Sequence, residues 1–172
     1  MSVTPIILDD RSSNTLSASN GADWRAISDT VMGGVSSGSL KPAVMDGRAC
    51  LRLTGEVSLE SNGGFVQASL DLSASGLLDA GDHAGIEIEV FGNGETYNLH
   101  LRTGDTRIVW QSYRASFQAT PSWQTLRLPF ESFQPHRIDQ PLDKHRLRRL
   151  GVVAIGRKMH VDICIARLSL YK

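Results

Sequence analysis

The sequence predicts an all-β protein, built as a jelly-roll-like β-sandwich. Apolar and polar residues alternate with a period of two along most of the 172 residues, as they do in strands with one solvated face. Turn residues, including many of the 16 glycines, separate these stretches into short strands. Strands with one apolar face bury it when two antiparallel sheets pack together. We therefore expect a single sandwich domain spanning residues 1–172.

Three segments in the first half of the chain alternate clearly. Gly47–Thr54 turns Leu51 and Leu53 to one side, and the strands expected at Gly64–Leu72 and Gly85–Phe91 follow the same pattern. The strand at Gly64–Leu72 has two unlike faces, one with Phe65, Gln67 and Ser69 and the other with Val66, Ala68 and Leu70. These strands should each have one face in the core and one in solvent.

Two hairpins are expected in the middle of the chain. The glycines and asparagine of Gly92–Gly94 suit a tight turn, so we expect Gly85–Phe91 to pair with Thr96–Arg102. A proline-containing turn similarly predicts that Tyr113–Thr120 pairs with Trp123–Phe130.

The last third of the chain is less regular. Prolines make Glu131–Leu142 unsuitable for a central strand, so a long surface loop is expected there. Leucines spaced among basic residues in Asp143–Leu150 predict one or two helical turns. Leu150–Ile155 and His160–Tyr171 should be strands, and a change of apolar register in the second predicts a bulge.

Composition excludes several classes of function. Lysine plus arginine equal aspartate plus glutamate at 18 each, so no net field attracts nucleic acid or an anionic membrane. No apolar run approaches the roughly 18 residues that would span a bilayer. The first residues make a poor signal peptide, and a cytoplasmic location is the expectation.

No catalytic or metal-binding motif stands out. The five histidines have none of the spacings of a zinc site. Asp79 and Asp82 offer two carboxylates where calcium takes six to eight oxygens, which favours a polar loop over a calcium site. Cys50 and Cys164 are expected to be small core residues, although the sequence leaves a disulfide between them open. We therefore expect neither an enzyme nor a bound cofactor.

The segment Trp24–Gly38 is the most distinctive part of the chain. Trp24 is a large apolar anchor, Asp29 can accept hydrogen bonds from backbone amides, and Gly33 and Gly34 permit a positive φ. One interpretation is a structural corner. The other is a binding surface, to which we assign Trp24, Ser28, Asp29, Met32, Gly33, Gly34 and Ser36.

An ordered set of motifs resembles the complex I intermediate-associated protein family from Trp24 to the C-terminus. The matching residues are Trp24, Ser28-Asp29, Met32-Gly33-Gly34-Val35-Ser36, Gly55–Ser58, Asn62–Phe65, Tyr97–Arg102, Tyr113, Phe117, Trp123, Leu128–Phe130, Phe133 and Ile155-Gly156. The resemblance implies a galactose-binding-domain-like β-sandwich. In mitochondrial members it implies a role in assembling the respiratory NADH dehydrogenase. The chain departs from the family at His136–Asp139, where an arginine followed by glycine is usual.

Two functions are compatible with these observations. The first is a non-catalytic protein-interaction module that resembles a respiratory complex I assembly factor, with a protein partner such as a subunit of a membrane-associated complex. Its surface would be Ser28–Ser36, with Arg102 or Arg157 nearby. The alternative is a carbohydrate-binding module, for which the candidate residues are Trp110, Tyr113, His100 and Arg102.

Overall fold

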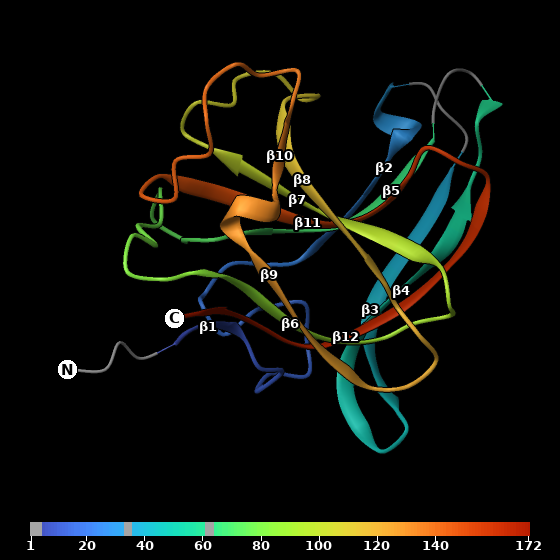
Figure 1. Cartoon of the computed structure of the whole chain (residues 1–172). Helices are drawn as coiled ribbons and strands as arrows, with labels where there is room; N and C mark the ends of the chain where they lie inside the picture. The colour runs from blue at the N-terminus through green and yellow to red at the C-terminus, as the bar shows by residue number, and fades with distance from the viewer. Residues whose placement is uncertain (1–4, 33–35, 61–63) are drawn as a thin grey trace.

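Two antiparallel β-sheets pack face to face in the computed structural model, which describes residues 5–32, 36–60 and 64–172 (Figure 1). Helical geometry within these residues is confined to short 3-10 turns. The prediction of an all-β sandwich is therefore confirmed. None of the described segments forms a helix of the length and apolarity that crossing a bilayer requires.

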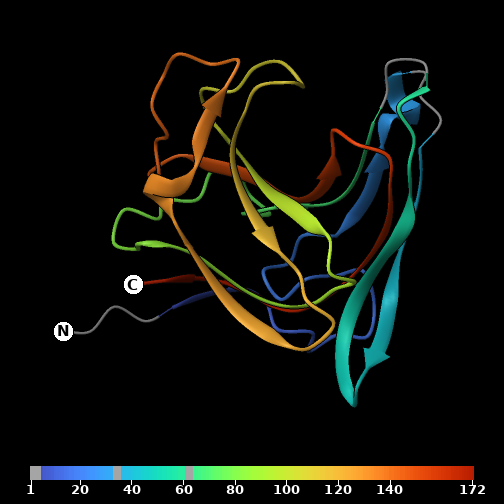
Figure 2. The same cartoon turned by 45° about the vertical axis from the view of Figure 1, so that its right-hand side comes forward.

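Within the described residues, each sheet has six strands. Sheet I contains, in spatial order, β3 (Ser37–Met45), β4 (Arg48–Val57), β12 (Met159–Tyr171), β6 (Gly85–Phe91) and β9 (Gln124–Pro129), and β1 (Ile6–Asp9) pairs with β12. Sheet II contains β10 (Gln134–His136), β8 (Ser112–Gln118), β7 (Thr96–Thr103), β11 (Leu147–Ile155), β5 (Phe65–Asp71) and β2 (Arg25–Ser28). In Figure 2 the hairpin of β3 and β4 runs along one side of the molecule.

The core lies between the two sheets and is filled by alternate residues of both. Sheet II contributes side chains such as Val66, Leu99 and Val152, and sheet I contributes Ile88 and Ile163, all of them fully buried. Because side chains alternate along a strand, the residues between these point away from the core. Sheet II therefore has a complete outer face of its own.

The two expected hairpins are wrong. β6 lies in sheet I and β7 in sheet II, and the chain changes sheets again between β8 and β9. The two connections instead bond to each other, since the Gly92 N–H donates to the Thr120 carbonyl over 2.8 Å and the Ala119 N–H donates to the Glu95 carbonyl over 3.0 Å. The turn residues were identified correctly, but they form corners of the sandwich.

The last third of the chain differs from expectation in two places. The expected loop Glu131–Leu142 contains the short edge strand β10, paired with β8. The helical turns expected at Asp143–Leu150 are absent, because Leu147 already begins β11 and is fully buried. The bulge in the last strand is confirmed by a shift in the pairing of β12 with β6 between Ile165 and Arg167.

The two cysteines are free thiols. Cys50 and Cys164 are both buried, in a small cluster that also contains Ala166 and is packed against Met45 and Trp123. They therefore occupy apolar positions, as expected for small core residues.

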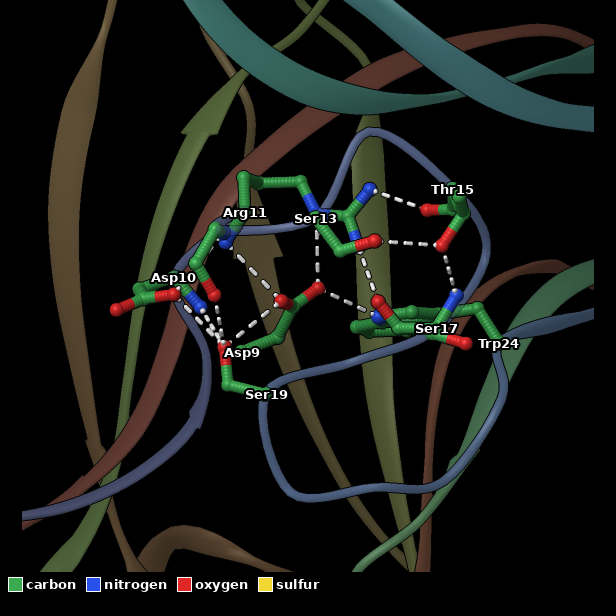
Figure 3. Close-up of polar contacts among 9 residues, drawn as sticks. Asp9, Asp10, Arg11, Ser13, Thr15, Ser17, Ser19 and Trp24 are labelled. Atoms are coloured by element: carbon green, nitrogen blue, oxygen red, sulfur yellow. Dashed lines mark hydrogen bonds and ion pairs between the residues drawn. The ribbon is translucent and has the colours of Figure 1, made fainter.

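A buried ion pair fastens the segment between β1 and β2 (Figure 3). Asp9 accepts hydrogen bonds from Arg11 Nε over 2.9 Å and from Trp24 Nε1 over 2.7 Å. The remaining guanidinium nitrogens of Arg11 donate to the carbonyls of Thr15 and Ser17. Arg11 has a φ of 61°, a costly conformation for a residue with a side chain, which these bonds offset. The network joins β1 to the tryptophan that begins the motif.

Replacing Asp9 by alanine should lower the free energy of unfolding by about 3–5 kcal/mol, because the Arg11 guanidinium would stay buried without its counter-ion. Asp10→Ala is the control, since the neighbouring Asp10 is exposed and its loss should cost below about 1 kcal/mol. Urea unfolding of both variants measures the difference. Equal losses would contradict the assigned role of the ion pair.

Candidate functional site

The predicted binding segment Ser28–Ser36 is organised around the buried carboxylate of Asp29. Asp29 begins the 3-10 turn η1 (Asp29–Met32) and is 0% exposed. Its Oδ1 accepts the Ser36 N–H over 2.8 Å, and its Oδ2 accepts the Ser36 hydroxyl and the backbone N–H groups of Gly64 and Phe65. One carboxylate thus ties η1 to the start of β3 and to the start of β5.

These bonds also fix the charge of Asp29. Burial raises the pKa of a carboxyl group, but the hydrogen bonds from Ser36, Gly64 and Phe65 outweigh it, so the pKa of Asp29 lies below its ordinary value. The carboxylate is ionised at neutral pH, and its charge is directed at backbone donors inside the protein. This geometry favours the structural interpretation of Asp29.

The other residues of the predicted site are dispersed. Trp24 is 1% exposed, Ser36 is buried, and Ser28 shares a hydrogen bond with the Thr30 hydroxyl. The side chain of Met32 and both Gly33 and Gly34 lie outside the described residues. Arg157 forms an ion pair with Glu95 over 2.6 Å. Arg102 lies elsewhere, in a groove on sheet II, and whether Ser28–Ser36 binds anything stays a prediction.

The outer face of sheet II carries a groove formed by two adjoining hollows of about 140 and 110 Å³. We call it the sheet II groove. It crosses β2, β5, β11, β7 and β8 and includes the loop between β7 and β8, and its lining residues are Ile27, Phe65, Gln67, Ser69, His100, Arg102, Val109, Trp110, Ser112, Arg114, Arg149, Gly151, Val153 and Ile155. Each hollow is smaller than a pocket that encloses a small molecule, roughly 300–1,000 Å³, so the shape suits an extended ligand that lies across the sheet.

One row of paired residues forms the middle of the groove. Ser69 on β5 is opposite Gly151 on β11, which is opposite His100 on β7, which is opposite Arg114 on β8. Directly opposed residues on one face have side chains about 5 Å apart. Gly151 has no side chain, and the side-chain amide of Gln67 lies over it, in the space that a Cβ at this position would occupy.

Three polar atoms in this groove are buried and have no hydrogen-bond partner among the described residues. They are Ser69 Oγ, His100 Nε2 and Arg102 Nε. Ser69 as a whole is 1% exposed. Buried polar atoms are nearly always paired, and each unpaired one costs about 1–3 kcal/mol. Their convergence on one groove is the strongest indication of a binding site in the described structure.

The groove is also positively charged. Arg102 and Arg114 line it, and neither forms an ion pair with a described residue. Burial lowers the pKa of His100 to about 3, with smaller effects from the charges of Arg114 and His136. His100 is therefore neutral at physiological pH, and its unpaired ring nitrogen can serve a ligand as donor or acceptor.

An apolar patch borders the groove on the loop between β7 and β8. Ile108, Val109 and Trp110 are consecutive and 43%, 59% and 50% exposed. The loop is held in place because Arg102 Nη2 donates to the Ile108 carbonyl over 3.2 Å and Gln111 accepts the Ile108 N–H. Neighbouring exposed apolar side chains on an ordered loop are typical of interaction sites.

A larger hollow, of about 630 Å³, lies beside β10 and the 3-10 turn η3 (Phe130–Ser132). Its described charged residues have mixed signs, with Glu131 and Asp143 near Lys144 and His145. Lys144 Nζ donates to the His83 carbonyl, and His145 pairs with Asp79 over 2.8 Å. With both of its basic side chains engaged in this way, it is a weaker candidate than the sheet II groove.

Comparison with family models identifies the group to which the chain belongs. The model of Complex I intermediate-associated protein 30 matches residues 13–162. The chain belongs to this family. The family resemblance predicted from the sequence is thus confirmed over most of its length. A comparison with curated proteins finds no match.

Solved structures with a similar fold include carbohydrate-binding modules from Clostridium thermocellum. The family 11 module of the cellulosomal cellulase Lic26A-Cel5E has 15% identity and a TM-score of 0.75, covering 99% of this chain and 96% of that one. A family 11 module in complex with a β-1,3-1,4-mixed-linked tetrasaccharide has 16% identity and a TM-score of 0.74, covering 99% and 97%. The family 30 module of Cel9D-Cel44B has 14% identity and a TM-score of 0.67, covering 98% and 96%. At these identities the similarity establishes the sandwich fold.

Asp29→Asn should destabilise the protein by about 1–3 kcal/mol at pH 7, because an amide nitrogen would face backbone donors that the carboxylate now accepts. The folded-state pKa of Asp29 is depressed. The stability that its charge contributes is therefore complete above the unfolded pKa, near 4, and is lost as the pH falls through the folded pKa. Thermal unfolding of both proteins between pH 7 and pH 3 should show the difference shrinking below about pH 4. A constant difference would contradict the role of the charge.

Two buried serines should differ in their contribution to stability. Ser36→Ala should cost about 1–3 kcal/mol, because the Ser36 hydroxyl donates to Asp29 and accepts the Ser58 N–H. Ser69→Ala should leave stability unchanged or raise it slightly, since Ser69 Oγ has no partner to lose among the described residues. Thermal unfolding of both variants provides the measurement. A loss for Ser69→Ala as large as that for Ser36→Ala would show that Ser69 is structural.

Proposed function

We propose that this chain is a non-catalytic protein-interaction module and that the sheet II groove is its binding surface. The observation that carries the proposal is the convergence of three unpaired buried polar atoms beside the exposed patch Ile108–Trp110. A partner that bonds these atoms and covers the patch recovers free energy that the isolated protein lacks.

The chemistry of the groove supports binding over catalysis. Among its described lining residues, arginine and neutral histidine are the titratable groups, and no carboxylate is among them to act as a general base. No cluster of three histidine, cysteine or acidic side chains in the described structure could hold a metal ion. The family is named for its association with complex I intermediates, and a role in assembly requires recognition of a protein.

The apolar border of the groove favours a protein partner. Ile108 and Val109 are aliphatic, and aliphatic side chains gain most from packing against other apolar side chains. Sugars lie against flat aromatic rings instead. A protein segment can bury all three residues of the patch.

A carbohydrate ligand is the second candidate, and Trp110 is the observation that favours it. Its half-exposed ring lines one hollow with Gln67, His100 and Arg114, so an aromatic surface stands beside hydrogen-bonding groups. Three of the four residues predicted for carbohydrate binding, Trp110, His100 and Arg102, line the groove. The fourth, Tyr113, is fully buried and bonds to the Gln140 carbonyl.

Val109→Ser should reduce the recovery of bound proteins several-fold when the tagged chain is purified from its native extract, because it removes apolar contact from the patch. Val44→Ser is the matched control, since Val44 is 72% exposed on β3 in the other sheet. Quantitative mass spectrometry compares both variants with the wild type. Partners lost equally from both variants would overturn the assignment to the groove.

A glycan array distinguishes the two candidates. Saturable binding of a saccharide by the wild type, weakened by Trp110→Ala and by Gln67→Ala, would favour the carbohydrate function and contradict the first proposal. Thermal unfolding of each variant provides the control for folding. An array without binding, together with loss of proteins from Val109→Ser alone, supports the protein-interaction function.

A further inference from the structure

The described residues that line the sheet II groove include arginines and no carboxylate. Arg102 and Arg114 have no ion-pair partner among the described residues, and no carboxylate is among the described residues that line the two hollows. The chain as a whole has 18 basic and 18 acidic residues, so this excess is local. An arginine pair without counter-ions in a partly buried groove attracts anions.

One carboxylate at the border of the groove is already engaged. Asp71, at the end of β5, pairs with Arg149 over 2.7 Å and with Arg25 over 3.6 Å. The single charge of Asp71 offsets part of the positive charge at the end of the groove that Arg149 lines. The positive charge of Arg102 and Arg114 remains uncompensated in its middle.

Burial of the two guanidinium groups costs free energy in the folded protein. Burial lowers the pKa of Arg102, and the charges of Arg149 and Arg148 lower it further. Burial likewise lowers the pKa of Arg114, with a smaller effect from Arg137. Both arginines stay charged at neutral pH, so a bound anion would relieve the repulsion and replace part of the lost hydration.

The spacing of the two arginines suits an extended chain. Arg114 is opposite His100, and Arg102 is two residues further along the same strand, so Arg102 and Arg114 are diagonal neighbours on one face. Diagonal neighbours are about 7 Å apart, which is also the distance between alternate side chains of an extended peptide. Carboxylates at positions i and i+2 of one segment can therefore each reach one arginine.

We propose that the sheet II groove takes an acidic, extended segment of a partner protein, with alternate carboxylates on Arg102 and Arg114 and an apolar side chain against Val109 and Trp110. The proposal rests on the protein-interaction function given above. It commits to a peptide because the positive charge lies beside an aliphatic patch, and one segment with both acidic and apolar residues satisfies both.

A random 12-residue peptide library displayed on phage, selected on the whole chain, tests this proposal. The selected peptides should be enriched in Asp and Glu at alternate positions and should contain an apolar residue. Fluorescence anisotropy should show that Arg114→Gln weakens their binding at least about tenfold. Arg127→Gln is the control. It removes the same charge from sheet I, away from the groove, and should leave binding unchanged. Raising the salt concentration from 50 to 300 mM should weaken the binding of the peptides to the wild type, because salt screens the attraction between opposite charges.

The outcomes separate this inference from the proposed function. One outcome is a set of peptides without acidic enrichment that bind less tightly to Val109→Ser but as tightly as to the wild type to Arg114→Gln. This outcome would overturn the acidic segment and would still support a protein-binding groove. Peptides insensitive to both substitutions would overturn both proposals. Uronic-acid oligosaccharides that displace the peptides and bind more tightly would overturn the choice of a protein ligand and assign the arginines to an acidic saccharide.

Discussion

Alternation of side chains along the strands of sheet II is the constraint on which the groove depends. On β5 the residues Val66 and Leu70 enter the core, and this places Phe65, Gln67 and Ser69 on the outer face. Because the period is two, a shift of pairing by one residue would exchange the two faces completely. The apolar core therefore fixes which polar groups meet in the groove.

The segment Trp24–Gly38 supports the groove through β2, which it contains. Trp24 immediately precedes β2 and bonds to the buried Asp9, and Asp29 immediately follows β2 and bonds to the starts of β3 and β5. Both ends of this edge strand are thus anchored by buried carboxylates. Ile27, between them, lines the groove. The most distinctive segment of the sequence thus holds one side of the groove in place.

The sequence predicted single strands well and their partners poorly. Alternation identifies which residues of a strand are buried, so β6 and the bulge in β12 were predicted correctly. It contains no information about which sheet a strand joins, and both expected hairpins were wrong for this reason. Predicting the groove would have required knowing which strands are neighbours in sheet II. The sequence placed Ser69 on one face of its strand and named His100 as a candidate for carbohydrate binding, but only the order β8-β7-β11-β5 brings these two residues together with Arg114.

A shared sandwich fold leaves the choice of ligand to the residues on its surface. The solved modules of Clostridium thermocellum share the arrangement of the backbone at 14–16% identity, and at this level the similarity establishes the fold and assigns no ligand to this chain. In the sheet II groove, Arg102 and Arg114 have no ion-pair partner among the described residues, and they lie beside the exposed patch Ile108–Trp110. A neutral sugar would supply hydroxyls to His100 and Gln67, but it would leave the charges of Arg102 and Arg114 without a counter-ion in a partly buried site. An acidic segment with an apolar residue would satisfy both kinds of group, which supports the proposal of a protein ligand.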